Sequence, residues 1–150
     1  MNRRDLLKAF AGAAALSVIP RSFAAKAAAE PVQFNQLYGS MGVRGVQYSD
    51  KLKRLAGQQV VMKGYMAPPL KPKLDFFVLT KQPMATCPFC SSAADWPVDI
   101  VLVVMPKGRE LEPSTKGLEV TGRLDIGVKR DEETGFVSLV RIYADQVKNA

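Results

Sequence analysis

The chain has 150 residues, with 21 basic and 14 acidic side chains and no histidine, and its formal charge is +7. Five of the basic residues and one acid fall within residues 1–29, so residues 30–150 carry 16 basic and 13 acidic side chains, a charge of only +3. This balance gives no reason to expect nucleic acid as a partner. The lack of histidine excludes Ser-His-Asp and Cys-His catalysis.

The N-terminal segment has the pattern of an export signal. Arg3 and Arg4 precede a leucine pair and a lysine, which resembles the twin-arginine signal, and an alanine-rich apolar stretch follows at residues 9–19. Eleven weakly apolar residues are too few for a helix that spans ~30 Å of hydrocarbon. We therefore expect residues 1–29 to be a signal peptide, with export by the twin-arginine machinery to the periplasm and no permanent membrane anchor.

The next segment contains short elements before the main β region. Residues 30–45 contain several glycines. They are expected to pack on the main body as a short turn or strand through Phe34, Leu37 and Tyr38. Residues 49–57 predict a short helix. Ser49 is its expected N-cap, and Gly57 is suited to end it.

After the helix the apolar residues alternate with polar ones, which is typical of β-strands. The third of these segments is apolar enough for burial on both faces. Gly64 and Gly122 occupy similar places in their strands, where a sharp bend is expected. The pattern therefore predicts a closed or nearly closed small barrel of five strands, at residues 59–67, 75–80, 98–105, 117–126 and 136–144.

Residues 57–147 resemble the OB-fold in this pattern. They differ from it in one respect, because residues 106–117 are too short and too rich in proline and glycine for the usual helix between the third and fourth strands. The expected fold class is mainly β: a five-stranded OB-like barrel with a short N-terminal helix, forming a single domain over residues 30–150. A β-sandwich is the alternative.

The chain is also similar to an uncharacterised group of exported bacterial OB-like proteins. The matching elements are a GYMAPPL strand at residues 64–70, an FFVLT strand at residues 76–80 and the cysteine-containing loop at residues 87–97. The resemblance implies a periplasmic accessory role, beside an envelope transporter for metal ions or an assembly system. It implies no enzymatic activity.

Cys87 and Cys90 are the only cysteines, and they lie in a loop that interrupts the strands. A structural disulfide between them would close so short a loop that it adds only about 2 kcal/mol. Thiol–disulfide exchange is a second alternative, because the Cys-Pro-x-Cys order resembles that of disulfide oxidoreductases. The sequence lacks the βαβ pattern that surrounds such a pair in thioredoxin-like proteins.

The third alternative, which we favour, is a soft metal ion, zinc or copper, held by Cys87 and Cys90. Zinc needs about four ligands, which Asp95 and Asp99 or a second chain would complete. Copper(I) accepts thiolate and thioether, and Met84 lies three residues before the first cysteine. The residue after the second cysteine is not histidine, which excludes c-type haem attachment. The predicted function is a non-catalytic periplasmic protein that binds zinc or copper.

Overall fold

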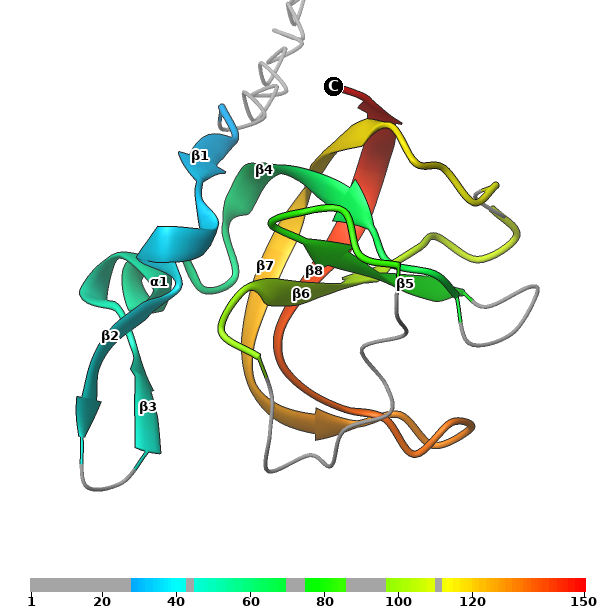
Figure 1. The fold of residues 1–150 in the computed structure, drawn as a ribbon. Coiled ribbons are helices and arrows are strands. Elements are labelled where there is room, and N and C mark those ends of the chain that lie inside the picture. Colours follow the sequence, from blue (N-terminus) through cyan, green and yellow to red (C-terminus); the bar gives the residue numbers. More distant parts are fainter. Residues whose placement is uncertain (1–27, 43–44, 70–74, 86–96, 110–111) are drawn as a thin grey trace, which may run out of the picture.

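The protein is mainly β, and its computed structural model describes residues 28–42, 45–69, 75–85, 97–109 and 112–150. Figure 1 shows the arrangement of the elements. In chain order they are β1 (Glu30–Val32), the 3-10 helix η1 (Phe34–Gln36), β2 (Tyr38–Gly42), β3 (Gly45–Tyr48), α1 (Asp50–Leu55), β4 (Gln59–Met66), β5 (Phe76–Thr80), β6 (Ile100–Val104), β7 (Gly117–Arg130) and β8 (Val137–Asn149).

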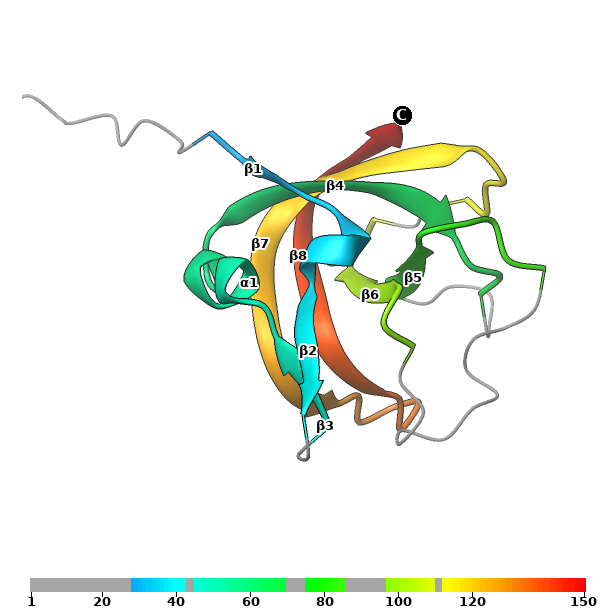
Figure 2. The ribbon, with the colours of Figure 1, turned by 60° about the vertical axis from the view of Figure 1, so that its left-hand side comes forward.

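Strands β4 to β8 pair in an order that leads back to its starting point. Strand β4 pairs with β5, and β5 with β6, both antiparallel. Strand β6 runs parallel to β8, β8 pairs antiparallel with β7, and β7 pairs antiparallel with β4. Strand β1 adds to β4 in parallel, and β2 and β3 form a separate two-stranded sheet. Figure 2 shows how strongly β4, β7 and β8 curve.

The main hydrophobic core lies on the concave side of these strands. It contains alternate residues of β4, such as Val60 and Met62, together with Phe77 and Leu79 of β5. Strands β5 and β6 are also buried on their other face, where Phe76 and Leu102 belong to a second apolar cluster. The predicted burial of both faces of the third strand is therefore confirmed.

Gly64 and Gly122 lie where two backbones approach too closely for a side chain. A Cβ at Gly64 would lie 2.6 Å from the carbonyl oxygen of Thr80. A Cβ at Gly122 would lie 2.8 Å from Cα of Ala144, at a register shift between β7 and β8. The two positions that the sequence marks as strand bends are thus places that only glycine fits.

Helix α1 begins as the sequence predicts. The Ser49 hydroxyl accepts a hydrogen bond from the Leu52 N–H (3.0 Å), and Leu52 and Leu55 are buried in the core. Gly57 follows the helix with φ +80°, a conformation that glycine adopts without strain. The same hydroxyl donates to the Gln36 carbonyl oxygen, which connects the helix to η1.

The N-terminal segment is more regular than the sequence predicts. Phe34 and Leu37 are buried and Tyr38 is partly buried, as expected. The sequence predicts a short turn or strand there, and the structure has the helical turn η1 and three strands, β1, β2 and β3. They are fixed by distant groups: Lys51 of α1 donates to the Pro31 carbonyl oxygen (2.9 Å), and the Tyr48 hydroxyl donates to that of Leu139 (3.0 Å).

Several strand ends differ from the predicted ones. Strand β6 begins at Ile100 rather than at residue 98. Strand β7 runs to Arg130 and β8 to Asn149, although the sequence predicts that these strands end at residues 126 and 144. Pairing continues across a bulge beside Gly127, whose φ is +117°. Near the C-terminal end of β8, the ammonium of Lys148 lies 2.8 Å from the Glu119 carboxylate of β7. This ion pair between the two strands favours a strand conformation for polar residues there.

No helix within the described residues is long and apolar enough to span a membrane.

Candidate functional site

The candidate site is the connection between β5 and β6, which carries both cysteines. Of the predicted ligands, Cys87, Cys90 and Asp95 lie outside the described residues, as do the signal residues Arg3 and Arg4. Their predicted roles therefore stay predictions. The structure describes residues 81–85 and 97–99, the two arms that lead into and out of this connection, which we name the loop stem.

The loop stem starts and ends at neighbouring points of the sheet. Thr80 and Ile100 are partners in the β5–β6 ladder, and the Lys81 N–H donates to the Asp99 carbonyl oxygen (N···O 3.2 Å). Thr80 is 1% exposed, and its hydroxyl lies 3.2 Å from the Tyr65 carbonyl oxygen and 2.7 Å from that of Gln82. One backbone hydrogen bond thus joins the two arms, and the Thr80 side chain anchors the first of them.

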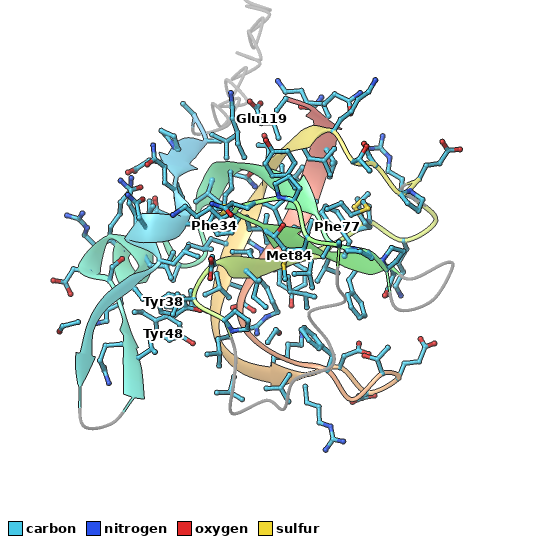
Figure 3. The ribbon with its side chains drawn as sticks, in the orientation of Figure 1. Phe34, Tyr38, Tyr48, Phe77, Met84 and Glu119 are labelled. Carbon is cyan, nitrogen blue, oxygen red and sulfur yellow. The ribbon has the colours of Figure 1, made fainter. Side chains whose placement is uncertain are left out.

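The two predicted ligands on the loop stem are accessible. Met84 is 38% exposed, and Asp99 on the other arm is exposed as well. Val98, next to Asp99, is 46% exposed. Figure 3 places Met84 close to the ribbon of β5 and β6. Such exposure is uncommon for a residue type that usually fills cores, so Met84 is accessible to a metal or a partner.

A cavity of about 280 Å³ lies between the loop stem and the N-terminal segment. Lys81, Val98 and Asp99 line it from the loop stem, and Phe34 and Tyr38 line it from η1 and β2. The 280 Å³ is slightly below the ordinary range for small-molecule sites. The sequence places Phe34 and Tyr38 on the main body, but it carries no signal that they line a cavity with the loop stem.

Within the described residues no three histidine, cysteine, aspartate or glutamate side chains cluster as metal ligands. The donors that the sequence offers near the loop stem are two thiolates, one thioether and carboxylates. This set suits a soft or borderline ion better than magnesium or calcium, which require several oxygen ligands. The donor chemistry therefore fits zinc or copper.

Sequence reasoning missed Arg141, the buried charge of β8. It is 3% exposed, and its Nε and Nη2 donate to the same carboxylate oxygen of Asp125, at 3.0 and 2.9 Å. Its Nη1 donates to the carbonyl oxygens of Gly127 (2.8 Å) and Ser138 (2.9 Å). A signal was present, because a lone arginine between Val140 and Ile142 breaks an apolar run. The arginine holds the β7–β8 bulge and takes no part in the loop stem.

Two carboxylates have lowered pKa values. The ammonium of Lys148 hydrogen-bonds Glu119 and holds the pKa of that carboxyl below its usual value, and Lys63 acts in the same direction. For Asp131 the main cause is the Thr134 hydroxyl, followed by the Thr134 N–H, and both donate to the carboxylate and lower its pKa. Both groups stay ionised at neutral pH.

Comparison with known proteins adds a likeness of fold. No protein-family model and no curated protein matches the sequence. The structure is similar to the crystal structure of a DUF3299 family protein from Pseudomonas aeruginosa, with a TM-score of 0.55 and 15% sequence identity over 82% of this chain and 97% of that one. At this identity the likeness shows that the two proteins share a mainly β fold.

Proposed function

We propose that the chain is an exported OB-like protein related to the DUF3299 family. The pairing order β4-β5-β6-β8-β7, with β7 returning to β4, supports a closed five-stranded barrel. The parallel β6–β8 pair and the long antiparallel β7–β8 pair are consistent with a Greek-key barrel of the OB type. The likeness to the DUF3299 protein supports a common fold.

The proposed function is to bind zinc or copper through Cys87 and Cys90, without catalysis. One observation carries it: both cysteines, at Cys-x-x-Cys spacing, belong to a connection whose two arms are tied together at the sheet by Lys81 and Asp99. The base of such a loop is fixed, so less conformational entropy is lost when the loop closes on an ion.

The remaining ligands decide between the two metals. Copper(I) would be satisfied by the two thiolates and the thioether of Met84, a residue that is 38% exposed. Zinc would require carboxylates, for which Asp95 and Asp99 are the nearest in sequence, or the cysteine pair of a second chain. Thiolates bind in the deprotonated form, so affinity should rise with pH.

The proposed setting is the periplasm, reached in the folded state by twin-arginine export. The support is Arg3 and Arg4 and the alanine-rich stretch behind them. Folding in the reducing cytoplasm would present both cysteines as thiols and allow metal to bind before export. The proposed partner is an envelope transporter or assembly component.

The test is elemental analysis of the protein purified from cytoplasm, beside the Cys87→Ser, Cys90→Ser double variant and Met84→Leu. Stoichiometric zinc or copper in the wild type, lost in the double variant, supports the proposal. Loss of copper but not zinc in Met84→Leu would assign the thioether. Metal-free wild-type protein that also takes up no added zinc or copper would contradict it.

A thiol pKa measurement separates metal binding from thiol exchange. A thiol–disulfide enzyme needs a Cys87 pKa well below ~8.5 and rapid exchange with glutathione. If the lowered Cys87 pKa and the rapid exchange are both found and no metal binds, thiol–disulfide exchange replaces metal binding as the proposed function. If no metal binds, no thiol exchange is found and the Cys87→Ser, Cys90→Ser variant only has a lower Tm, the two cysteines form a structural disulfide.

A further inference from the structure

A second cavity, of about 490 Å³, is lined by Phe34 and Asn35 of η1 and extends along β4 to Glu119 of β7. It shares Phe34, Asn35 and Lys81 with the 280 Å³ cavity beside the loop stem, so the two meet at these residues. We name them together the η1 groove. In Figure 3 Phe34 lies between Glu119 and Tyr38, which are at the two ends of the groove.

Hydrogen bonds to Ser49 and Lys51 fix residues 31–36, which form one wall of the η1 groove. Lys51 of α1 donates to the Pro31 carbonyl oxygen (2.9 Å) and to the Gln36 side chain (3.1 Å). The Gln36 side chain in turn accepts from the Gln33 N–H (3.2 Å), and Ser49 donates to the Gln36 carbonyl oxygen. A ligand would therefore meet a formed wall, and little ordering would be needed when it binds.

The η1 groove combines an apolar floor with an uneven distribution of charge. Val32, Phe34 and Val61 supply apolar surface. At one end the Glu119 carboxylate is balanced by Lys148 at 2.8 Å and Lys63 at 3.4 Å. At the junction of the cavities Lys81 is exposed, and no carboxylate of the described residues lies within ion-pairing distance of its ammonium.

We propose that the η1 groove binds a small amphipathic anion, an apolar body that carries one carboxylate or sulfonate group. The anionic group would lie at Lys81, and the apolar body would cover Phe34 and Val61. The Asn35 amide, which lines both cavities, supplies a neutral donor beside the anion. Glu119 does not oppose this placement, because its charge is already compensated at the far end. The exposed Asp99 lines only the smaller cavity, so the anionic group would lie on the side of Lys81 that lines the larger one. The inference needs no metal at the cysteines.

Fluorescence titration with 1-anilinonaphthalene-8-sulfonate tests this charge preference. N-phenyl-1-naphthylamine has the same apolar body without the sulfonate and serves as the neutral probe. The variant is Lys81→Met, which removes the charge and keeps most of the length. The matched control is Lys107→Met, another exposed lysine on a turn after a strand that lines neither cavity. Circular dichroism of each variant verifies the fold.

We expect Lys81→Met to weaken binding of the sulfonate about five- to tenfold, to leave the neutral probe unchanged and to reduce the salt dependence. Lys107→Met should change neither probe. Amide chemical shifts should move at Phe34, Asn35 and Lys81, also in the Cys87→Ser, Cys90→Ser variant. Equal weakening by both lysine variants, an effect below twofold, or shifts confined to other parts of the protein would overturn the inference.

Discussion

The close approach of β7 and β8 at Gly122 predicts a large effect of a single methyl group. In Gly122→Ala the new Cβ would lie 2.8 Å from Cα of Ala144 and closer still to the Tyr143 carbonyl oxygen. Both are backbone atoms of β8, which is paired on one side with β7 and on the other with β6. Strand β8 therefore cannot move away without disturbing a second ladder.

The magnitude follows from two opposing effects. Overpacking of this kind usually costs about 1–3 kcal/mol. Replacing glycine with alanine recovers about 0.4–1 kcal/mol by restricting the unfolded chain. We expect a net loss of about 1–2 kcal/mol in the free energy of unfolding, which lowers the Tm by roughly 4–8 °C in a domain of this size.

Gly39→Ala is the matched control, because the nearest atoms to its new Cβ lie at 3.9 and 4.0 Å, which is ordinary van der Waals contact. Its stability should stay within about 0.5–1 kcal/mol of the wild type. The measurement is urea and thermal unfolding followed by circular dichroism. A Gly122→Ala protein as stable as the wild type, or a Gly39→Ala protein that loses as much, would refute the close-approach argument.

Three further predictions concern buried or structured polar groups. Arg141→Met should lower the free energy of unfolding by about 2–3 kcal/mol, because buried carbonyl oxygens lose their donor. Asp125→Asn leaves the buried guanidinium without its counter-charge, so it should lower the free energy of unfolding by at least about as much; a urea midpoint equal to that of the wild type in either variant would contradict this. Tyr48→Phe should cost about 1–2 kcal/mol and speed amide exchange at Gly127, whose N–H donates to that hydroxyl; unchanged exchange would argue against the contact. Folding lowers the pKa of Asp131 from 3.8, so the stabilisation that its carboxylate provides is complete above that value and is lost as the pH falls through the folded pKa. The urea midpoint of Asp131→Asn should therefore be lower than that of the wild type at pH 7, and it should fall less than the wild-type midpoint between pH 5 and 2. Parallel pH curves for the two proteins would show that the interaction is weak.

The sequence predicts the strands well where their pattern is local. Alternation over residues 59–66 and 117–126 and the apolar run at residues 100–104 each identify a strand. Ser49 and Gly57 mark the ends of α1 because capping is local as well. These signals do not depend on what the element packs against.

The parts that were missed depend on distant contacts. Strand β1 is three residues long and gains its ladder from β4. The β2–β3 hairpin is fixed through Tyr48, whose hydroxyl contacts residues 79 and 91 positions away in the chain. No local pattern reports such contacts. For the same reason the sequence marked the cysteine loop as a site but not the η1 groove, whose walls come from η1, β4 and the loop stem.

The central claim is that Cys87 and Cys90 hold a soft metal ion, and X-ray absorption at the metal edge tests it most directly. The sample is the zinc- or copper-loaded protein, and the double serine variant is the control. For zinc the account predicts at least two sulfur neighbours at about 2.3 Å, absent from the variant. A first shell of only oxygen and nitrogen in the wild type, or the same spectrum for both proteins, would contradict it.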